Sequence, residues 1–166
     1  MNPVLAAGLL IGVLCAVWTF IMGATGWYKD PAMMRWFFLV IAIEVGGLIW
    51  GLRRTAAEGR TYGAQVIAGT MMATIAGVVI ICSSLLFTTV VYTDYFAELE
   101  AMNVKLLREQ GMPESEIDRQ VTAERASNTP MGHALLGFTG TLITGIIASA
   151  LLSIAIRGRP RPTLDR

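Results

Sequence analysis

The strongest constraint in this sequence is a long run without any charged residue, from Gln65 to Val91. A helix needs roughly 20 apolar residues to cross the hydrocarbon core of a bilayer, and this run is longer. Beyond it, apolar residues continue at three- and four-residue steps, with no Pro or Gly before Gly111. We therefore expect one helix from Tyr62 to Gln110 that begins inside a membrane and continues into water.

The composition places the rest of the chain in a membrane as well. Of the 166 residues, 54% are hydrophobic and only 15% are charged, which makes a soluble domain a poor interpretation. Four apolar segments predict spans at about 4–28, 33–52, 62–92 and 131–156. The first segment exceeds the ~7–15 apolar residues of a signal peptide, so we expect it to remain as a span. The predicted fold is all-α, a single integral membrane four-helix bundle over residues 1–166.

Residues 93–130, between the third and fourth spans, predict a helical hairpin outside the bilayer. Eight acidic and four basic side chains lie between Asp94 and Pro130, which is typical of a solvated segment. Gly111 would end the first arm, and Pro113 at a first helical position would start a second arm that reaches Ser127. Apolar positions of the two arms would then pack together, namely Leu99, Met102 and Leu106 against Ile117 and Val121.

The distribution of Arg residues predicts the orientation. Arg53, Arg54 and Arg60 lie between spans two and three, and four more follow span four in a basic tail at 157–166. The positive-inside rule places both termini and the Arg53–Arg60 loop in the cytoplasm, and the hairpin outside. The tail could also rest on anionic headgroups, but a topology determinant is the simpler interpretation.

Three short motifs carry a resemblance to a known family. They are Gly-Arg-Thr-Tyr-Gly-Ala-Gln at Gly59–Gln65, Gly-Met-Pro-Glu-Ser-Glu-Ile at Gly111–Ile117, and Asn-Thr-Pro at Asn128–Pro130. With the order of spans and loops, the chain resembles the bacterial membrane-protein family catalogued as domain of unknown function 4199. The resemblance implies a helical protein of the bacterial inner (cytoplasmic) membrane, and it assigns no catalytic or binding residue.

Small residues recur at every fourth position in the predicted spans. Such stripes let helix backbones approach closely, because van der Waals contact and interhelical hydrogen bonds drive helix association in lipid. Packing within one bundle accounts for most of them, and a homodimer is the alternative that stays open. The glycines that we expect to pack helices are Gly8, Gly12, Gly69, Gly77, Gly137 and Gly145.

Glu44 is the one ionisable residue well inside a predicted span. It lies between Trp36 and Trp50, close to the expected bilayer centre, where a carboxylate is costly. Two interpretations compete. A protonated Glu44 could be a structural hydrogen-bond donor between helices, with hydroxyl partners such as Thr70, Thr74, Ser83 or Thr144. Alternatively, Glu44 could be a proton- or cation-coupled site in a cavity of the bundle, where intramembrane acids are usually found.

The remaining candidate groups point to no cofactor. His133, just inside span four, could titrate near neutral pH, but an interfacial histidine bonded to backbone or lipid is a simpler interpretation than a metal ligand. We expect Cys15 and Cys82 to be reduced and buried in apolar surroundings. No P-loop, dinucleotide fingerprint, Ser/His/Asp set or zinc spacing occurs, so we expect no enzyme, metal, cofactor or nucleic-acid partner.

We expect the lipid bilayer to be the main partner of the protein. Two functional classes remain. The first is an interaction or assembly protein that presents the outer hairpin to a partner protein. The second is a small proton-coupled transporter or lipid-handling protein that uses Glu44.

Overall fold

The computed structural model describes residues 2–156, and within them it contains helices and no strand. Four segments are long and apolar enough to cross a membrane: Pro3–Thr25, Pro31–Ala56, Tyr62–Val91 and Pro130–Ala155. They correspond to α1 (Pro3–Thr25), α2 (Pro31–Met34) continued by η2 (Arg35–Phe38) and α3 (Leu39–Ala56), α4 (Tyr62–Leu86) continued by η3 (Phe87–Val91), and α7 (Pro130–Ala155). The predicted fold class is confirmed: the described residues form an all-α bundle with four helical segments long and apolar enough to cross a membrane. The predicted tail at 157–166 lies outside the described residues.

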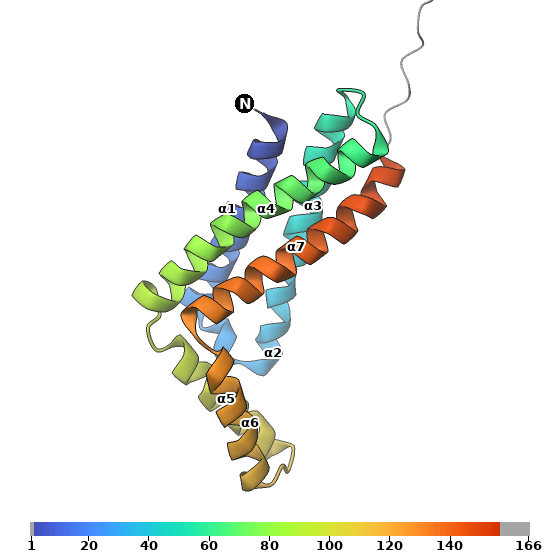
Figure 1. The fold of residues 1–166 in the computed structure, drawn as a ribbon. Coiled ribbons are helices and arrows are strands. Elements are labelled where there is room, and N and C mark those ends of the chain that lie inside the picture. Colours follow the sequence, from blue (N-terminus) through green and yellow to red (C-terminus); the bar gives the residue numbers. More distant parts are fainter. Residues whose placement is uncertain (1, 157–166) are drawn as a thin grey trace, which may run out of the picture.

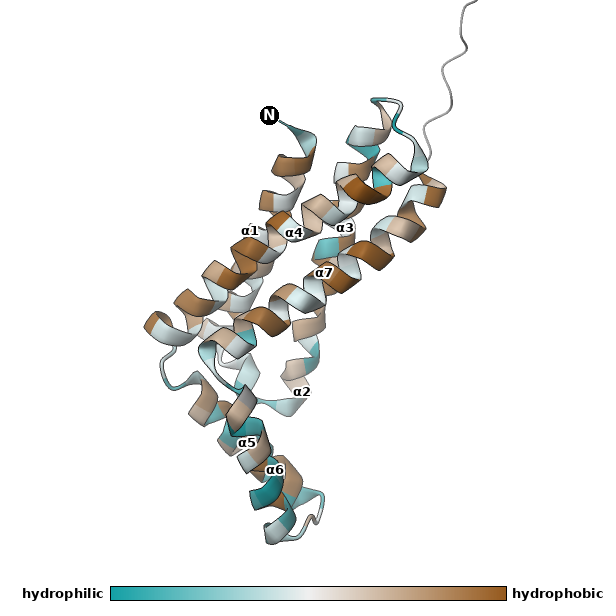
Figure 2. Ribbon diagram, viewed as in Figure 1, coloured by the Kyte–Doolittle hydropathy of each residue, from teal (hydrophilic) through white to brown (hydrophobic). Residues whose placement is uncertain are grey.

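Helix α4 lies at the centre of the arrangement. It packs along α1 on one side and α7 on the other, and α3 contacts all three of these helices (Figure 1). The large apolar side chains on the outside of the bundle are exposed, as a lipid-facing surface requires, among them Ile67, Leu136 and Leu151. Figure 2 shows this apolar exterior, and it also shows one hydrophilic band in the middle of α3.

Two glycines of α1 determine how closely α1 approaches α4. A Cβ atom on Gly8 would lie 2.7 Å from Ile75 Cβ, and one on Gly12 would lie 2.6 Å from Val79 Cβ. Both distances are too short for real atoms, so neither position can hold a larger residue without moving a helix. The four-residue step from Gly8 to Gly12 matches the step from Ile75 to Val79, which gives a continuous contact.

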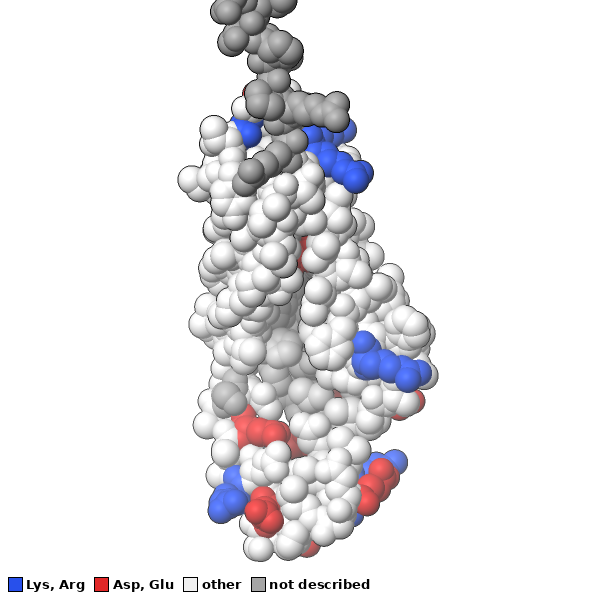
Figure 3. All heavy atoms as spheres, turned by 90° about the vertical axis from the view of Figure 1, so that its right-hand side faces the viewer, with Lys and Arg blue, Asp and Glu red and all other residues white. Residues whose placement is uncertain are grey.

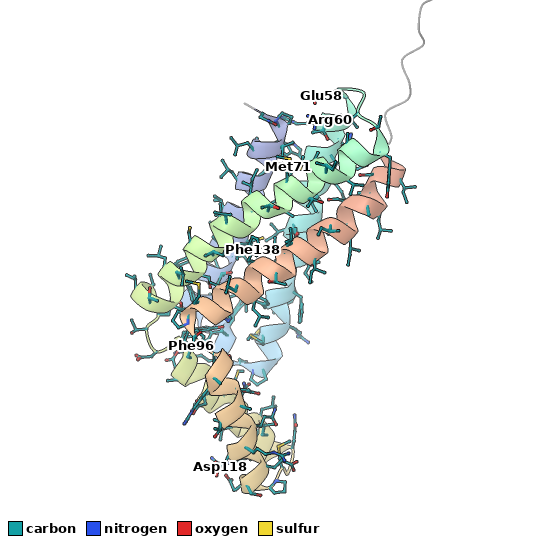
Figure 4. The ribbon with its side chains drawn as sticks, in the orientation of Figure 1. Glu58, Arg60, Met71, Phe96, Asp118 and Phe138 are labelled. Carbon is teal, nitrogen blue, oxygen red and sulfur yellow. The ribbon has the colours of Figure 1, made fainter. Side chains whose placement is uncertain are left out.

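Helices α4 and α7 run antiparallel, and small residues alternate across their contact. Gly69 faces Ser149, Gly145 faces Ala73, and Gly137 lies against Ile80. A Cβ atom on Gly77 would lie 2.5 Å from the Phe138 ring, which Figure 4 shows on α7. All six glycines of the predicted stripes therefore lie in helix contacts within one chain.

The prediction of a single helix from Tyr62 to Gln110 is wrong. The regular helix ends at Leu86, a π-helical turn follows at Phe87–Val91, and α5 begins only at Tyr95. The Tyr92 N–H bonds the Phe87 carbonyl at 2.8 Å, and Tyr92 then leaves helical geometry with φ −126° and ψ 68°. Four β-branched residues from Thr88 to Val91 weaken the helix here.

Aromatic packing explains why the chain turns at this point. The Phe87 ring contacts those of Tyr92 and Tyr95 at centroid distances of 4.5 and 5.3 Å. Tyr28, from η1 (Trp27–Lys29), packs on Tyr95 at 5.2 Å. A straight helix would carry Tyr95 away from Tyr28, so contacts between distant segments outweigh local helical periodicity.

The predicted helical hairpin is confirmed as α5 (Tyr95–Glu109) and α6 (Glu114–Ser127), which project from one end of the bundle with Asp118 near the tip (Figures 1 and 4). Gly111 ends α5 with φ +77°, a conformation that favours glycine, and the Met112 N–H bonds the Leu107 carbonyl. Pro113 caps α6 instead of occupying its first position.

The inner face of the hairpin is covered by its own arms. Ile117 and Val121 are buried, and ion pairs join the arms, including Arg125 to Glu100. Leu99, which we expected against α6, packs against the Tyr28–Phe87–Tyr95 cluster and so ties α5 to the bundle.

Candidate functional site

The carboxyl group of Glu44 lies inside the bundle, on the face of α3 that meets α7. The residue is only 4% exposed, and its Oε1 atom makes no hydrogen bond within the described residues. A Cβ atom built on Gly145 would lie 3.1 Å from this oxygen, so the glycine leaves room for the carboxyl group. A buried carboxyl oxygen without a partner costs free energy, and such groups in membrane proteins usually mark functional sites.

Glu44 lies in the wall of a cavity of about 310 Å³ between the long helices. Most of the lining is apolar, and three aromatic rings contribute to it: Phe20, Phe37 and Phe38. Small-molecule sites in proteins are typically cavities of ~300–1,000 Å³ with a few polar groups in an apolar wall. Figure 3 shows that charged side chains on one face gather toward the two ends, with a hollow in the largely uncharged middle.

Hydroxyl groups line the same cavity, but none bonds Glu44. The Ser83 hydroxyl donates to the Ile80 carbonyl at 3.1 Å, and Thr144 and Thr141 also lie in the wall. Thr70 and Thr74, two of the predicted hydroxyl partners, instead donate to the carbonyls one turn earlier, at 3.0 and 2.9 Å. These two hydroxyls are satisfied within their own helix and contribute nothing to the site.

A smaller cavity of about 140 Å³ lies next to the first, under the base of the hairpin. Its wall includes Tyr28 from η1 and Tyr95 and Leu99 from α5. His133 lines both cavities, and its ring meets the edges of Tyr95 and Phe96 at centroid distances of 5.4 and 5.8 Å. The sequence placed His133 at the outer interface but gave no sign that it faces inward.

A polar cluster holds α5 over this smaller cavity. Glu98 of α5 accepts hydrogen bonds from the Tyr28 hydroxyl and from Lys29, the latter at 2.6 Å. The bond from Lys29, followed by that from Tyr28, lowers the pKa of Glu98. Burial, and then the bond to Glu98, raise the pKa of Tyr28, so this tyrosine stays a neutral donor. We call Tyr28, Lys29 and Glu98 the latch.

The two cysteines differ in their surroundings. Cys15 is buried and lines the Glu44 cavity, whereas Cys82 is exposed on the outside of α4, so the expectation that both are buried is wrong for Cys82. Within residues 2–156, no three His, Cys, Asp or Glu side chains gather in a way that could hold a metal ion. Glu44, several hydroxyl groups and three phenylalanine rings lie together in the wall of the larger cavity.

Sequence reasoning missed the aromatic wall of the cavity. Phe37 and Phe38 belong to the run Trp-Phe-Phe at the start of the second span, which resembles an interfacial anchor. Their role in the cavity depends on the 3-10 turn at Arg35–Phe38 and on contacts from α1, and neither leaves a signal in the sequence.

Comparison with known proteins identifies the family. No curated protein and no solved structure matches this chain. The model of one family, described as protein of unknown function (DUF4199), matches residues 7–158, which is most of the chain. The match includes most of the first candidate span, all of the other three, the hairpin, Glu44 and His133. This chain, with its four long apolar helices and its projecting helical hairpin, therefore belongs to the DUF4199 family.

Proposed function

We propose that the bundle is a ligand-binding protein of the transporter or lipid-handling class, and that its cavity takes a lipophilic cation whose charge rests against Glu44. The observation that carries the proposal is the buried Glu44 oxygen without a hydrogen-bond partner, in the wall of a 310 Å³ cavity. Aromatic rings also favour cations, since their faces carry negative potential. Phe20, Phe37 and Phe38 therefore suit the same ligand.

Binding of such a cation would be coupled to a proton. An empty site favours the neutral carboxylic acid, because desolvation disfavours a lone carboxylate. A cation that enters stabilises the carboxylate, so the carboxyl proton leaves as the ion pair forms, and the net charge of the site does not change. The site therefore supports an exchange of a proton for an organic cation.

The test uses benzyltrimethylammonium, which combines an aromatic ring with a permanent charge, and its neutral isostere neopentylbenzene. We expect the cation to raise the thermal unfolding temperature of the purified protein, since a ligand stabilises the state that it binds. In Glu44→Gln, benzyltrimethylammonium should no longer raise the unfolding temperature, whereas the response to neopentylbenzene should not change. Glu109→Gln, which alters an exposed acid of the hairpin, should keep the response to the cation. Equal binding of the cation by wild type and Glu44→Gln would refute the proposal.

The second candidate is an assembly role of the hairpin. Its two arms are joined by ion pairs such as Arg108 to Glu114, with Nε to Oε1 at 2.7 Å, so the acidic outer surface is ordered before any partner arrives. A basic protein surface would fit it. Loss of a specific co-purifying protein on charge reversal at Glu116 and Asp118 would support this role, and unchanged recovery of every associated protein would oppose it.

We place the protein in the bacterial cytoplasmic membrane, with both termini in the cytoplasm. Support comes from Arg53, Arg54 and Arg60 at the end of the bundle opposite the hairpin, where Figure 4 shows Arg60 and Glu58. We also propose binding and transport instead of catalysis, because the sequence carries no catalytic motif.

A further inference from the structure

The two cavities meet at a common wall. Four residues line both of them: Thr19 of α1, Phe37 of η2, Ser84 of α4 and His133 of α7. Residues that line two cavities at once form the layer between them, and we call this layer the neck. The larger cavity, with Glu44 in its wall, is thus separated from the smaller cavity under the hairpin by this one layer of side chains.

We infer that the smaller cavity is the vestibule through which a cation or proton reaches Glu44, and that His133 is the gate in the neck. The inference rests on the proposed function for the identity of the ligand, whereas the route rests on the four residues that the two cavities share. It assigns the hairpin a role in the same site, since α5 supplies part of the vestibule wall through Tyr95 and Leu99.

The position of His133 depends on the docking of α5. Its imidazole ring lies against Tyr95 and Phe96, which both come from the first turn of α5. The latch holds that turn onto η1 through the bonds of Glu98 to Tyr28 and Lys29. Movement of α5 away from η1 would therefore free the histidine ring and widen the neck.

The groups around the gate suit a cation or proton. On the vestibule side, the titratable side chains are those of Tyr28 and Tyr95, with Glu98 and Lys29 neutralising each other behind Tyr28. On the inner side they are Glu44 and Cys15. No Lys or Arg side chain lines either cavity within the described residues, so no fixed positive charge opposes the passage of a cation.

The native Cys15 thiol offers a direct probe of this route, because it lines the larger cavity and not the smaller one. We would replace the exposed Cys82 by Ser and measure how fast trimethylammonium-ethyl methanethiosulfonate modifies Cys15 in the purified protein. His133→Trp should slow the modification about tenfold or more by filling the neck, and His133→Ala should speed it. Tyr28→Phe should also speed it by breaking the latch.

A matched control is Ile143→Trp, at an exposed position of α7 that lines neither cavity. It should leave the rate unchanged. Helical content and monodispersity are checked for each variant. If His133→Trp and His133→Ala both keep the parent rate, the vestibule route is refuted, whatever the cation-binding result. If the rates change as expected but benzyltrimethylammonium does not bind, the route stands and the proposed ligand class fails.

Discussion

Gly145 of α7 lies directly beside the carboxyl group of Glu44 on α3, at a place where a single added methyl carbon would stand 3.1 Å from Glu44 Oε1. The same carbon would collide with Ala73 of α4. One glycine therefore serves two purposes. It allows α7 to contact α4, and it makes space for a carboxyl group in the wall of the cavity.

Gly145→Ala should destabilise the bundle. The new methyl group meets Ala73 Cβ, which cannot rotate away, so α7 must shift, and overpacking of this kind typically costs about 1–3 kcal/mol. Unfolding in mixed detergent micelles measures the effect. Gly140→Ala, on the same helix with nothing within 4 Å of the added carbon, is the matched control and should be neutral or slightly stabilising. Equal stability of the two variants would contradict this account of the helix contact.

The position of Glu44 near the middle of the helical segment Pro31–Ala56 could be predicted from the sequence, but the shape of its cavity could not. Trp36, Trp50 and the uncharged stretches between them locate the carboxyl group along the span. The rotation of each helix about its axis could not be predicted, because lipid-facing and buried positions are equally apolar. Cys82 and Thr74 show this, since their exposed positions could not be told from buried ones.

The break in the helix before α5 was missed for a different reason. Helical spacing of apolar residues continues through Tyr92 and Tyr95, so the pattern alone predicts one helix. The β-branched run from Thr88 to Val91 weakens the helix, and contact of Tyr92 and Tyr95 with Tyr28, a residue far away in sequence, accompanies the break. In contrast, Gly111 and Pro113 are local signals, and they placed the turn of the hairpin to within a residue.

The hairpin should depend on Ile117, the most buried side chain of α6, at 1% exposure. Ile117→Ala leaves a cavity between the arms, and substitutions of this type cost about 2–5 kcal/mol in well-packed cores. We expect faster amide exchange in α5 and α6 with little change in α4 and α7. Ala123→Ser, at an exposed position of α6, is the control. Slow exchange throughout the hairpin of Ile117→Ala would show that the arms do not depend on this contact.

Acidification should release the hairpin from the bundle. Hydrogen bonds from Lys29 and Tyr28 lower the pKa of Glu98 in the folded state, so its stabilising contribution is fully present above the unfolded value of about 4.3 and is lost as pH falls through the lowered folded pKa. Near-ultraviolet circular dichroism of the tyrosine cluster should follow this loss. Glu98→Gln should flatten the change, and Glu109→Gln should not. An identical pH profile in Glu98→Gln would exclude the latch as its origin.

Orientation can be tested with single cysteines in a variant that lacks Cys15 and Cys82. A cysteine at Arg54 should be shielded from impermeant thiol reagents in intact cells, and one at Glu114 should be labelled, because the Arg-rich loop is expected in the cytoplasm. Permeabilised cells supply the control, in which both sites react. Labelling of a cysteine at position 54 in intact cells would show that the protein has the opposite orientation.

The final prediction separates the two interpretations of Glu44. If Glu44 is a structural donor between helices, its replacement by an apolar residue of similar length removes a hydrogen bond and weakens the bundle. In the structure, however, Oε1 has no hydrogen-bond partner among the described residues, so the desolvation cost of this oxygen is not offset by a hydrogen bond.

We therefore expect Glu44→Met to raise the stability of the bundle by about 1 kcal/mol or more. The same variant should lose the response to benzyltrimethylammonium. A site kept for function at a cost in stability behaves in this way. Glu44→Gln should lie between wild type and Glu44→Met in unfolding experiments, since the amide keeps a polar group in the wall. A marked loss of stability in Glu44→Met, with Glu44→Gln unaffected, would establish the structural interpretation instead.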